Sequence, residues 1–240
     1  MFTDDDQGGR DVMAEGVVQA ANSKGRSHLK VLAPEGVPFR DWGDEALMLE
    51  HAGGSEGAFE ELLRRHQKGV LNYVYRMVQN RQIAEELTQE VFLALVRNAQ
   101  RYEPRAKFTT YLYAIASNIV SKEWLRQKRR PRFLSLSRCF SRRNNDDEGF
   151  DPLEHVGDAR ADVVATSQRE EISEAVNTAL RELPEHQREA FILRRFRDLS
   201  YEEIAEVTNS PIGTAKSRVV RAERALRPLL ERFREYLNTR

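Results

Sequence analysis

Residues 200–218 read SYEEIAEVTNSPIGTAKSR, and this stretch decides the fold of the C-terminal part of the chain. Ser200 followed by Glu203 is a capping box, a pattern that starts a helix because each side chain can bond to the other residue's backbone N–H. Asn209 is one of the few non-glycine residues that tolerate the left-handed conformation in which a helix ends sharply. The pair Ser210-Pro211 then predicts a second helix, with Ser as the cap and Pro in the first position.

The second of these helices has two unlike faces. Its apolar residues recur at steps of three and four and predict one buried stripe, formed by Ile212, Ala215, Val219, Ala222 and Leu226. The opposite stripe is polar and basic, and consists of Thr214, Ser217, Arg218, Arg221 and Arg224, with Lys216 and Arg227 beside it. Such a helix suits the DNA major groove, where Arg contacts guanine edges and Ser, Thr and Lys hold phosphates. A basic stripe alone would also describe a solvated surface helix, but two helices with caps and a turn in this order favour a DNA-binding helix-turn-helix.

Further helical periods lie upstream of this motif. Apolar residues repeat at helical spacing over 59–77, 83–96 and 108–120, and again over 172–183. In the second of these stretches the repeat includes Val96. No run with a period of two is bounded by hairpin turn residues, so we expect no strands. The predicted fold class is all-α.

The helical periods are interrupted once, which predicts two domains. Residues 131–166 scatter Pro, Ser, Asn and Gly between unlike charges and read as a flexible linker. Residues 1–41 have no sustained period and read as a disordered N-terminal extension. We therefore expect two helical domains, 42–130 and 167–238, and the second contains the helix-turn-helix.

The formal net charge of zero hides a strong segregation of charge. Between Lys122 and Arg143, nine Lys or Arg side chains stand against one acid, Glu123. The following stretch, 146–162, is acidic. This pattern predicts a surface that binds a polyanion, next to acidic segments that could fold over it.

Other classes of protein find no support in the sequence. The start of the chain is acidic and lacks an apolar core, so it is no secretory signal, and no stretch is apolar enough to enter a membrane. Cys139 is the single cysteine, which excludes an internal disulfide and predicts a reducing cytoplasm. The five histidines have no metal-ligand spacing, and residues 53–57 lack the Lys-Ser/Thr of a phosphate-binding loop. We expect no catalytic residues, no metal and no cofactor.

Four motifs give the chain a family resemblance. Residues 84–92 (AEELTQEVF) and 108–118 (FTTYLYAIASN) resemble two segments of the sigma-70 family of bacterial RNA polymerase subunits, in its small extracytoplasmic-function (ECF) group. Residues 183–191 (LPEHQREAF) and 213–218 (GTAKSR) are similar to the domain of that family that reads the promoter −35 element. The resemblance implies a sigma factor that binds core RNA polymerase, through its clamp helices and flap, and directs promoter-specific transcription initiation. It also implies an anti-sigma protein as a partner.

The resemblance assigns roles to particular positions of this chain. Residues that would bind polymerase are Glu86, Gln89, Glu90 and Phe92. Residues that would melt the −10 element and hold its single strand are Tyr102, Arg105, Lys107, Tyr111, Asn118, Lys122 and Arg126. Residues that would contact double-stranded −35 DNA are Thr214, Lys216, Ser217, Arg218, Arg221 and Arg224. Two other classes stay open: a stand-alone helix-turn-helix regulator that dimerises through 42–130, and a helical adaptor that binds only proteins.

Overall fold

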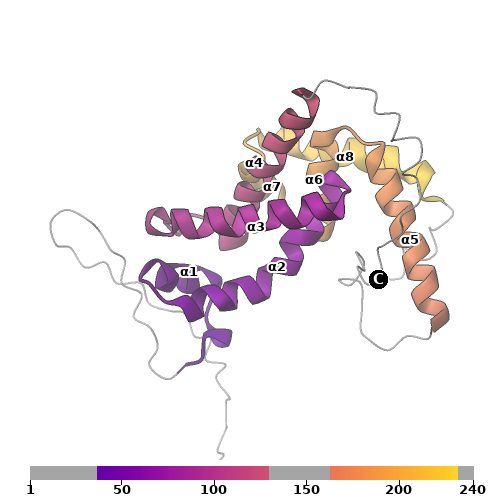
Figure 1. Cartoon of the computed structure of the whole chain (residues 1–240). Helices are drawn as coiled ribbons and strands as arrows, with labels where there is room; N and C mark the ends of the chain where they lie inside the picture. The colour runs from indigo at the N-terminus through magenta and orange to yellow at the C-terminus, as the bar shows by residue number, and fades with distance from the viewer. Residues whose placement is uncertain (1–36, 130–162, 232–240) are drawn as a thin grey trace, which may run out of the picture.

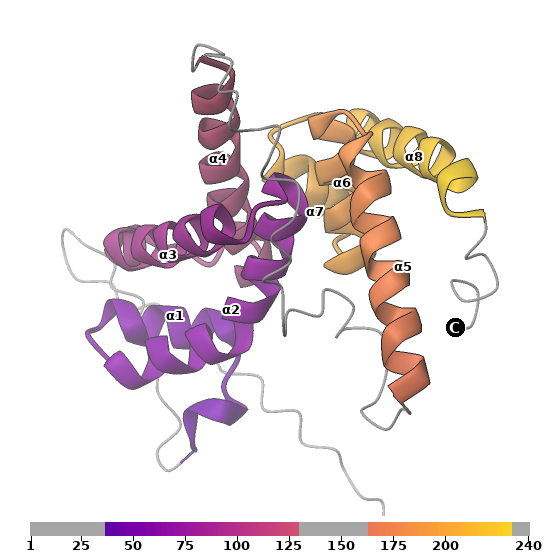
Figure 2. The ribbon, with the colours of Figure 1, turned by 45° about the vertical axis from the view of Figure 1, so that its right-hand side comes forward.

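Helices form all the regular structure in the parts of the chain that the computed structural model describes, residues 37–129 and 163–231. The prediction of an all-α fold is confirmed. Figures 1 and 2 show two groups of helices that lie against each other, with α5 (Val163–Arg181) projecting at one edge.

The first domain consists of four α-helices joined by short turns. They are α1 (Asp44–Ala52), α2 (Glu56–Val78), α3 (Arg81–Asn98) and α4 (Phe108–Arg129), and the short helix η2 (Ala99–Arg101) follows α3. Ser55 starts α2 by accepting the Ala58 N–H, and Asn80 starts α3 in the same way. The turn between α2 and α3 is tight because Gln79 takes the left-handed conformation, with φ 53°.

The predicted disordered extension, 1–41, is wrong at its C-terminal end. Phe39–Asp41 form the 3-10 helix η1, while residues 1–36 lie outside the described ranges. Arg65 of α2 fixes this turn, since its guanidinium donates to the carbonyl oxygens of Phe39 and Arg40 at 3.0 and 2.8 Å. A long-range anchor of this kind leaves no periodic signal in the sequence.

The second domain contains α5, α6 (Glu185–Phe196), α7 (Tyr201–Val207) and α8 (Ile212–Leu229). The capping box is present as predicted, because Ser200 and Glu203 each bond to the other's backbone N–H. Asn209 ends the turn with φ 44°, in the left-handed region. Two expectations are corrected. The Ser210 hydroxyl pairs with Thr208 Oγ1 at 2.9 Å and does not cap α8, and α5 begins at Val163, inside the predicted linker.

The two domains share one continuous apolar core. Side chains from α2 and α4 pack against α6 and α7, and the buried set runs from Leu47 in α1 to Leu226 in α8. At the centre of the contact, the Glu189 carboxylate of α6 accepts from the Tyr73 hydroxyl of α2 at 3.0 Å. The sequence predicted the two domains but not this contact between them.

Candidate nucleic-acid interface

The outer face of α8 carries the predicted DNA contacts. The helix is held by its apolar stripe, in which Ala215, Val219 and Ala222 are fully buried and Leu226 is nearly so. Ile212 departs from the prediction, since half of its side chain is exposed at the first position of the helix. We name the opposite stripe the α8 face; it consists of Thr214, Ser217, Arg218, Arg221 and Arg224.

The α8 face is basic and accessible. Arg221 and Arg224 are exposed, as is the neighbouring Lys216, whereas Arg218 is half-buried. The Ser217 hydroxyl donates to the Thr214 carbonyl oxygen at 2.9 Å, so it is directed along the helix. Residues three and four apart on a helix lie one above the other, which aligns these side chains along the length that a major groove could receive.

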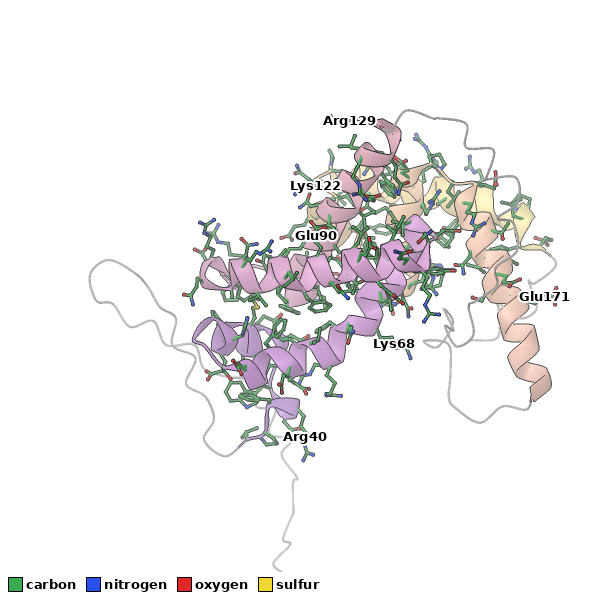
Figure 3. All side chains as sticks on the ribbon, in the orientation of Figure 1. Arg40, Lys68, Glu90, Lys122, Arg129 and Glu171 are labelled. Atoms are coloured by element: carbon green, nitrogen blue, oxygen red, sulfur yellow. The ribbon has the colours of Figure 1, made fainter. Side chains whose placement is uncertain are left out.

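A second basic face runs along α4. Tyr111, Asn118, Lys122 and Arg126 follow one another at steps of seven and four, so they share one side of the helix. Tyr111 is half-buried and the other three are exposed. Figure 3 labels Lys122 on this helix, and Arg129 at its end. We call these four side chains the α4 face.

Tyr102 does not lie on this face. It follows η2, as a loop residue was expected to, but only 7% of it is exposed. Its ring packs 5.1 Å from Tyr111 and 6.4 Å from Phe108, measured between ring centroids. Burial raises the pKa of Tyr102 well above its usual value. The predicted base contact by Tyr102 is therefore corrected to a role in the packing beneath Tyr111.

The loop before α4 holds the other two predicted −10 residues. Arg105 and Lys107 are both exposed, and Arg105 pairs with Glu103. Lys107 Nζ lies 2.9 Å from Glu203 Oε1 of the capping box in the second domain. The Ser200 backbone N–H, and to a smaller extent Lys107, lower the pKa of the Glu203 carboxyl.

A third surface lies on the outer side of α3. Glu86, Gln89 and Glu90 are exposed as predicted, while Leu87, Val91 and Leu95 point into the core. Phe92 is corrected: only 6% of it is exposed, and its ring meets Phe59 edge to face.

The same side of α3 exposes two apolar residues that the sequence analysis did not assign to it. Leu93 is 54% and Val96 is 41% exposed, although Val96 was expected in the core. Their signal was the helical spacing of 86, 89, 93 and 96. We name Glu86, Gln89, Glu90, Leu93 and Val96 the α3 strip.

The α3 strip and the α4 face meet at Arg126. Arg126 Nε bonds to Glu123 Oε2 at 2.5 Å, and this bond raises the pKa of the guanidinium. Glu86 and Glu90 add weaker electrostatic attraction from α3. Arg126 therefore stands between the acidic strip and the basic face, and Figure 3 shows Glu90 just below Lys122.

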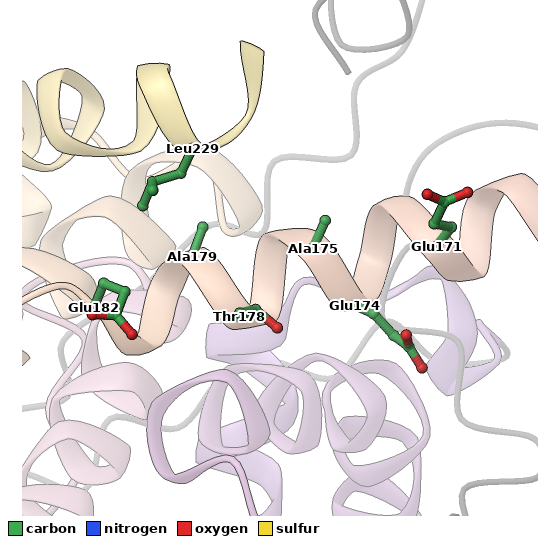
Figure 4. Close-up of a pocket in the computed structure, with 7 residues that line it drawn as sticks. All are labelled: Glu171, Glu174, Ala175, Thr178, Ala179, Glu182 and Leu229. Atoms are coloured by element: carbon green, nitrogen blue, oxygen red, sulfur yellow. The ribbon is translucent and has the colours of Figure 1, made fainter. Parts of the chain in front are cut away.

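Other kinds of site find little support in the described ranges. A cavity of about 290 Å³ lies between α5 and the end of α8 (Figure 4), and three glutamates among its lining residues would repel phosphate groups. No group of three or more His, Cys, Asp or Glu side chains there could hold a metal ion. None of the described helices is both long and apolar enough to cross a membrane.

Family comparisons agree with both groups of helices. The model for sigma-70 region 2 matches residues 62–130, and the model for sigma-70 region 4 matches residues 173–226. The chain is 32% identical over 191 residues to the RNA polymerase sigma-H factor of Pseudomonas aeruginosa, covering 78% of this chain and 95% of that protein. It is 31% identical over 195 residues to the ECF RNA polymerase sigma-E factor of Haemophilus influenzae, covering 78% and 97%.

Solved structures share the fold. CnrH, in complex with the cytosolic domain of CnrY, gives a TM-score of 0.52 at 20% identity over 78% of this chain and 97% of that one. The sigma factor RpoE of Bartonella quintana, in complex with the anti-sigma factor NepR, gives 0.53 at 21% identity over 72% and 96%. With the α3, α4 and α8 surfaces each placed within the matched regions, the chain belongs to the sigma-70 family of RNA polymerase sigma factors, in its extracytoplasmic-function group.

Proposed function

We propose that this chain binds core RNA polymerase and directs it to promoters by contacting their −10 and −35 elements. The observation that carries the proposal is the presence of both matched regions, in order, in one chain whose exposed faces are acidic on α3 and basic on α4 and α8. In domain terms, residues 42–130 dock on polymerase and open the −10 element, 131–166 connect, and 167–238 read the −35 element.

The α3 strip is the surface that we assign to polymerase. Its acidic end, Glu86 to Glu90, attracts a basic partner, and exposed Leu93 and Val96 supply apolar area that a partner can cover. Interfaces commonly combine such an apolar centre with a charged rim. The clamp helices of core polymerase are the partner that the family implies for this strip.

The α4 face is the surface that we assign to the melted −10 strand. Lys122 and Arg126, with Arg105 and Lys107 of the preceding loop, provide positive charge for the phosphate backbone. Asn118 and Tyr111 provide a hydrogen-bonding group and a ring for unstacked bases. Because a flipped base costs a few kcal/mol and a stacking contact returns about 1–3 kcal/mol, only well-matched promoters should open.

The α8 face is the surface that we assign to double-stranded −35 DNA. Arg218 lies in its middle, where a guanidinium can bond to a guanine edge with two hydrogen bonds. Exposed Lys216, Arg221 and Arg224, with Thr214 and Ser217, contact phosphates. Two weak DNA contacts held by one polymerase then select a promoter together.

Three further parts of the proposal follow from the family. The chain acts in the cytoplasm, where polymerase is, and works as an initiation factor that has no catalytic activity and needs no cofactor. An anti-sigma protein controls it; the two structural relatives described above were each solved with a partner protein, which is an anti-sigma factor in the second.

The decisive experiment is reconstituted transcription. Purified chain and core polymerase are given a library of promoter fragments, and the start sites are mapped. We expect initiation from templates that share paired −10 and −35 sequences, and none with core polymerase alone. If polymerase does not retain the chain, or if the chain binds palindromic DNA tightly on its own, the proposal is wrong and the stand-alone regulator is favoured.

A further inference from the structure

The two DNA surfaces lie close together in this structure. Lys107, before α4, contacts Glu203 in α7, and α8 begins nine residues after Glu203. Even a fully extended connection would leave Arg218 no more than roughly 55 Å from Lys107. The described contact therefore sets an upper limit on the distance between the −10 and −35 surfaces.

A promoter demands a larger separation. The −10 and −35 elements are centred about 25 base pairs apart, which is roughly 85 Å along straight B-form DNA. The arrangement in Figure 2 cannot place both domains on such a template at once. The contact between the domains has to break before both elements are read.

We propose that this arrangement is a closed, inactive state, held by a polar latch at which Glu189 of the second domain bonds to Tyr73 and Ser117 of the first. This inference rests on the proposed function. It adds that the chain blocks its own promoter recognition through named residues, and that polymerase binding opens the latch.

The latch has the chemistry of a reversible contact. Glu189 is only 3% exposed, and its Oε1 accepts from Tyr73 Oη at 3.0 Å and from Ser117 Oγ at 2.5 Å. A buried carboxylate is tolerated only with such donors, which makes the docked position specific. When the domains separate, water replaces the donors on every one of these groups, so opening leaves none of them unsatisfied.

Charge pairs around the latch cover the basic surfaces of the first domain. Lys128 Nζ at the end of α4 lies 2.8 Å from Glu185 Oε2, and Lys107 faces Glu203 as described. Both lysines are largely exposed, so these pairs hold weakly and chiefly set orientation. Because the two carboxylates occupy places that DNA phosphates would take, closing also weakens the first domain's attraction for DNA.

A backbone contact completes the closed state. Arg188, next to Glu189 in α6, donates from Nη1 to the Met77 carbonyl oxygen at the end of α2, at 2.9 Å. Arg197 reaches Tyr113 of α4 at 3.3 Å. The two arginines lie on opposite sides of the latch in sequence and attach α6 to both α2 and α4.

A reversible cross-link tests the proposal in the full chain. In a Cys139→Ser background, Lys128→Cys and Glu185→Cys place thiols on a contacting pair outside the assigned binding residues. A short bis-maleimide with a disulfide in its spacer joins them, and a reductant later cuts the spacer. We expect rapid cross-linking in the free chain, at least a tenfold loss of initiation with core polymerase, and recovery after reduction.

Each other outcome counts against the proposal. If the thiols do not cross-link in the free chain, or if the cross-linked chain initiates as well as the reduced one, the closed inactive state is refuted while the proposed function stands. If the chain that was never cross-linked fails to initiate, the proposed function fails and this inference fails with it.

A second variant tests the latch itself. Tyr73→Phe with Ser117→Ala removes both donors and leaves the Glu189 carboxylate buried without them, so the cross-linking rate should fall at least tenfold. Ser121→Ala, one turn further along α4, is the control and should leave that rate unchanged. If the double variant does not fold, as judged by circular dichroism, Glu189→Gln takes its place and should lower the rate at least threefold. An unchanged rate in a folded latch variant would refute the role of Glu189.

Discussion

Ser200 and Glu203 hold each other's backbone: the Glu203 N–H donates to Ser200 Oγ at 3.2 Å, and the Ser200 N–H donates to Glu203 Oε2 at 2.7 Å. The remaining Glu203 oxygen faces Lys107. One carboxylate thus starts the first helix of the helix-turn-helix and contacts the other domain.

Replacing the cap should destabilise the second domain. Ser200→Ala removes the acceptor for the Glu203 N–H, and the expected loss is about 1 kcal/mol in the free energy of unfolding. Urea denaturation followed by circular dichroism measures it. Ser210→Ala is the matched control, because that hydroxyl pairs with Thr208 and does not cap α8, and its loss should be clearly smaller. Equal losses would contradict the capping role.

Two basic residues of α8 should behave differently on DNA. Arg218→Ala should cost about 1–3 kcal/mol on the preferred −35 sequence and relax selectivity at one base pair, because a base-edge contact is lost. Lys216→Ala should weaken all −35 sequences alike, since it loses a phosphate contact. Initiation rates on a panel of single-base −35 variants separate the two. A uniform loss for Arg218→Ala would remove its base-reading role.

On α3, exposed and buried neighbours should separate binding from folding. Gln89→Ala with Glu90→Ala should reduce affinity for core polymerase about tenfold or more, at unchanged stability, as expected when interface contacts are lost. Phe92→Ala should instead cost about 3–5 kcal/mol of stability, because it empties a buried site. A normal core affinity for the double variant would overturn the assignment of the α3 strip.

The −10 preference should depend on Asn118 and not on the Tyr102 hydroxyl. Asn118 is exposed on the α4 face, whereas the Tyr102 hydroxyl is buried and has no hydrogen-bond partner among the described residues. Tyr102→Phe should leave −10 selectivity unchanged, and Asn118→Ala should alter it at one position. Permanganate footprinting of the opened strand on −10 variants is the measurement. A changed preference for Tyr102→Phe would return Tyr102 to the binding site.

Acid should destabilise the first domain through two carboxyls. The Arg64 hydrogen bond, helped by Arg65, lowers the pKa of Glu61 from 4.5 to about 2. Burial opposes ionisation of Asp44, but hydrogen bonds and charges from His66 and Arg65 outweigh it and lower its pKa as well. The ionised forms are thus favoured by folding. Their stabilisation is present above the unfolded pKa values and is lost as pH falls from about 4.5 towards about 2.

Thermal melting between pH 7 and pH 2 measures this loss. Glu61→Gln should lower the melting temperature at pH 7 and flatten its fall in acid. Glu60→Gln, at the exposed neighbouring position, should change neither. An acid profile that is unchanged in Glu61→Gln would show that the Glu61 carboxyl does not contribute.

The local signals in the sequence predicted most of the helices correctly. The capping box, the left-handed Asn209 and the inward Leu87, Val91 and Leu95 all depend on contacts within a few residues, and the structure confirms them. Errors fall where a side chain lies at the margin of a stripe. A spacing of three and four does not decide whether Phe92 turns inward or Ile212 outward, because neighbouring helices decide it.

Contacts between distant segments could not be predicted. Glu189 sits in a polar stretch, PEHQRE, that reads as a solvated helix start, yet donors more than 70 residues away bury it. Tyr102 follows a loop and reads as exposed, but the ring of Tyr111 covers it. In both cases the partner comes from a different helix, and no periodicity within one segment carries that information.

The exposed leucine and valine of the α3 strip also limit how much free protein a cell can hold. In water, Leu93 and Val96 form an adhesive patch until a partner covers them. When synthesis exceeds the supply of polymerase and of any inhibitor, the surplus should precipitate or be captured by chaperones and proteases. Dosage of this factor is then self-limiting, and co-expression with a binding partner is the practical route to concentrated samples.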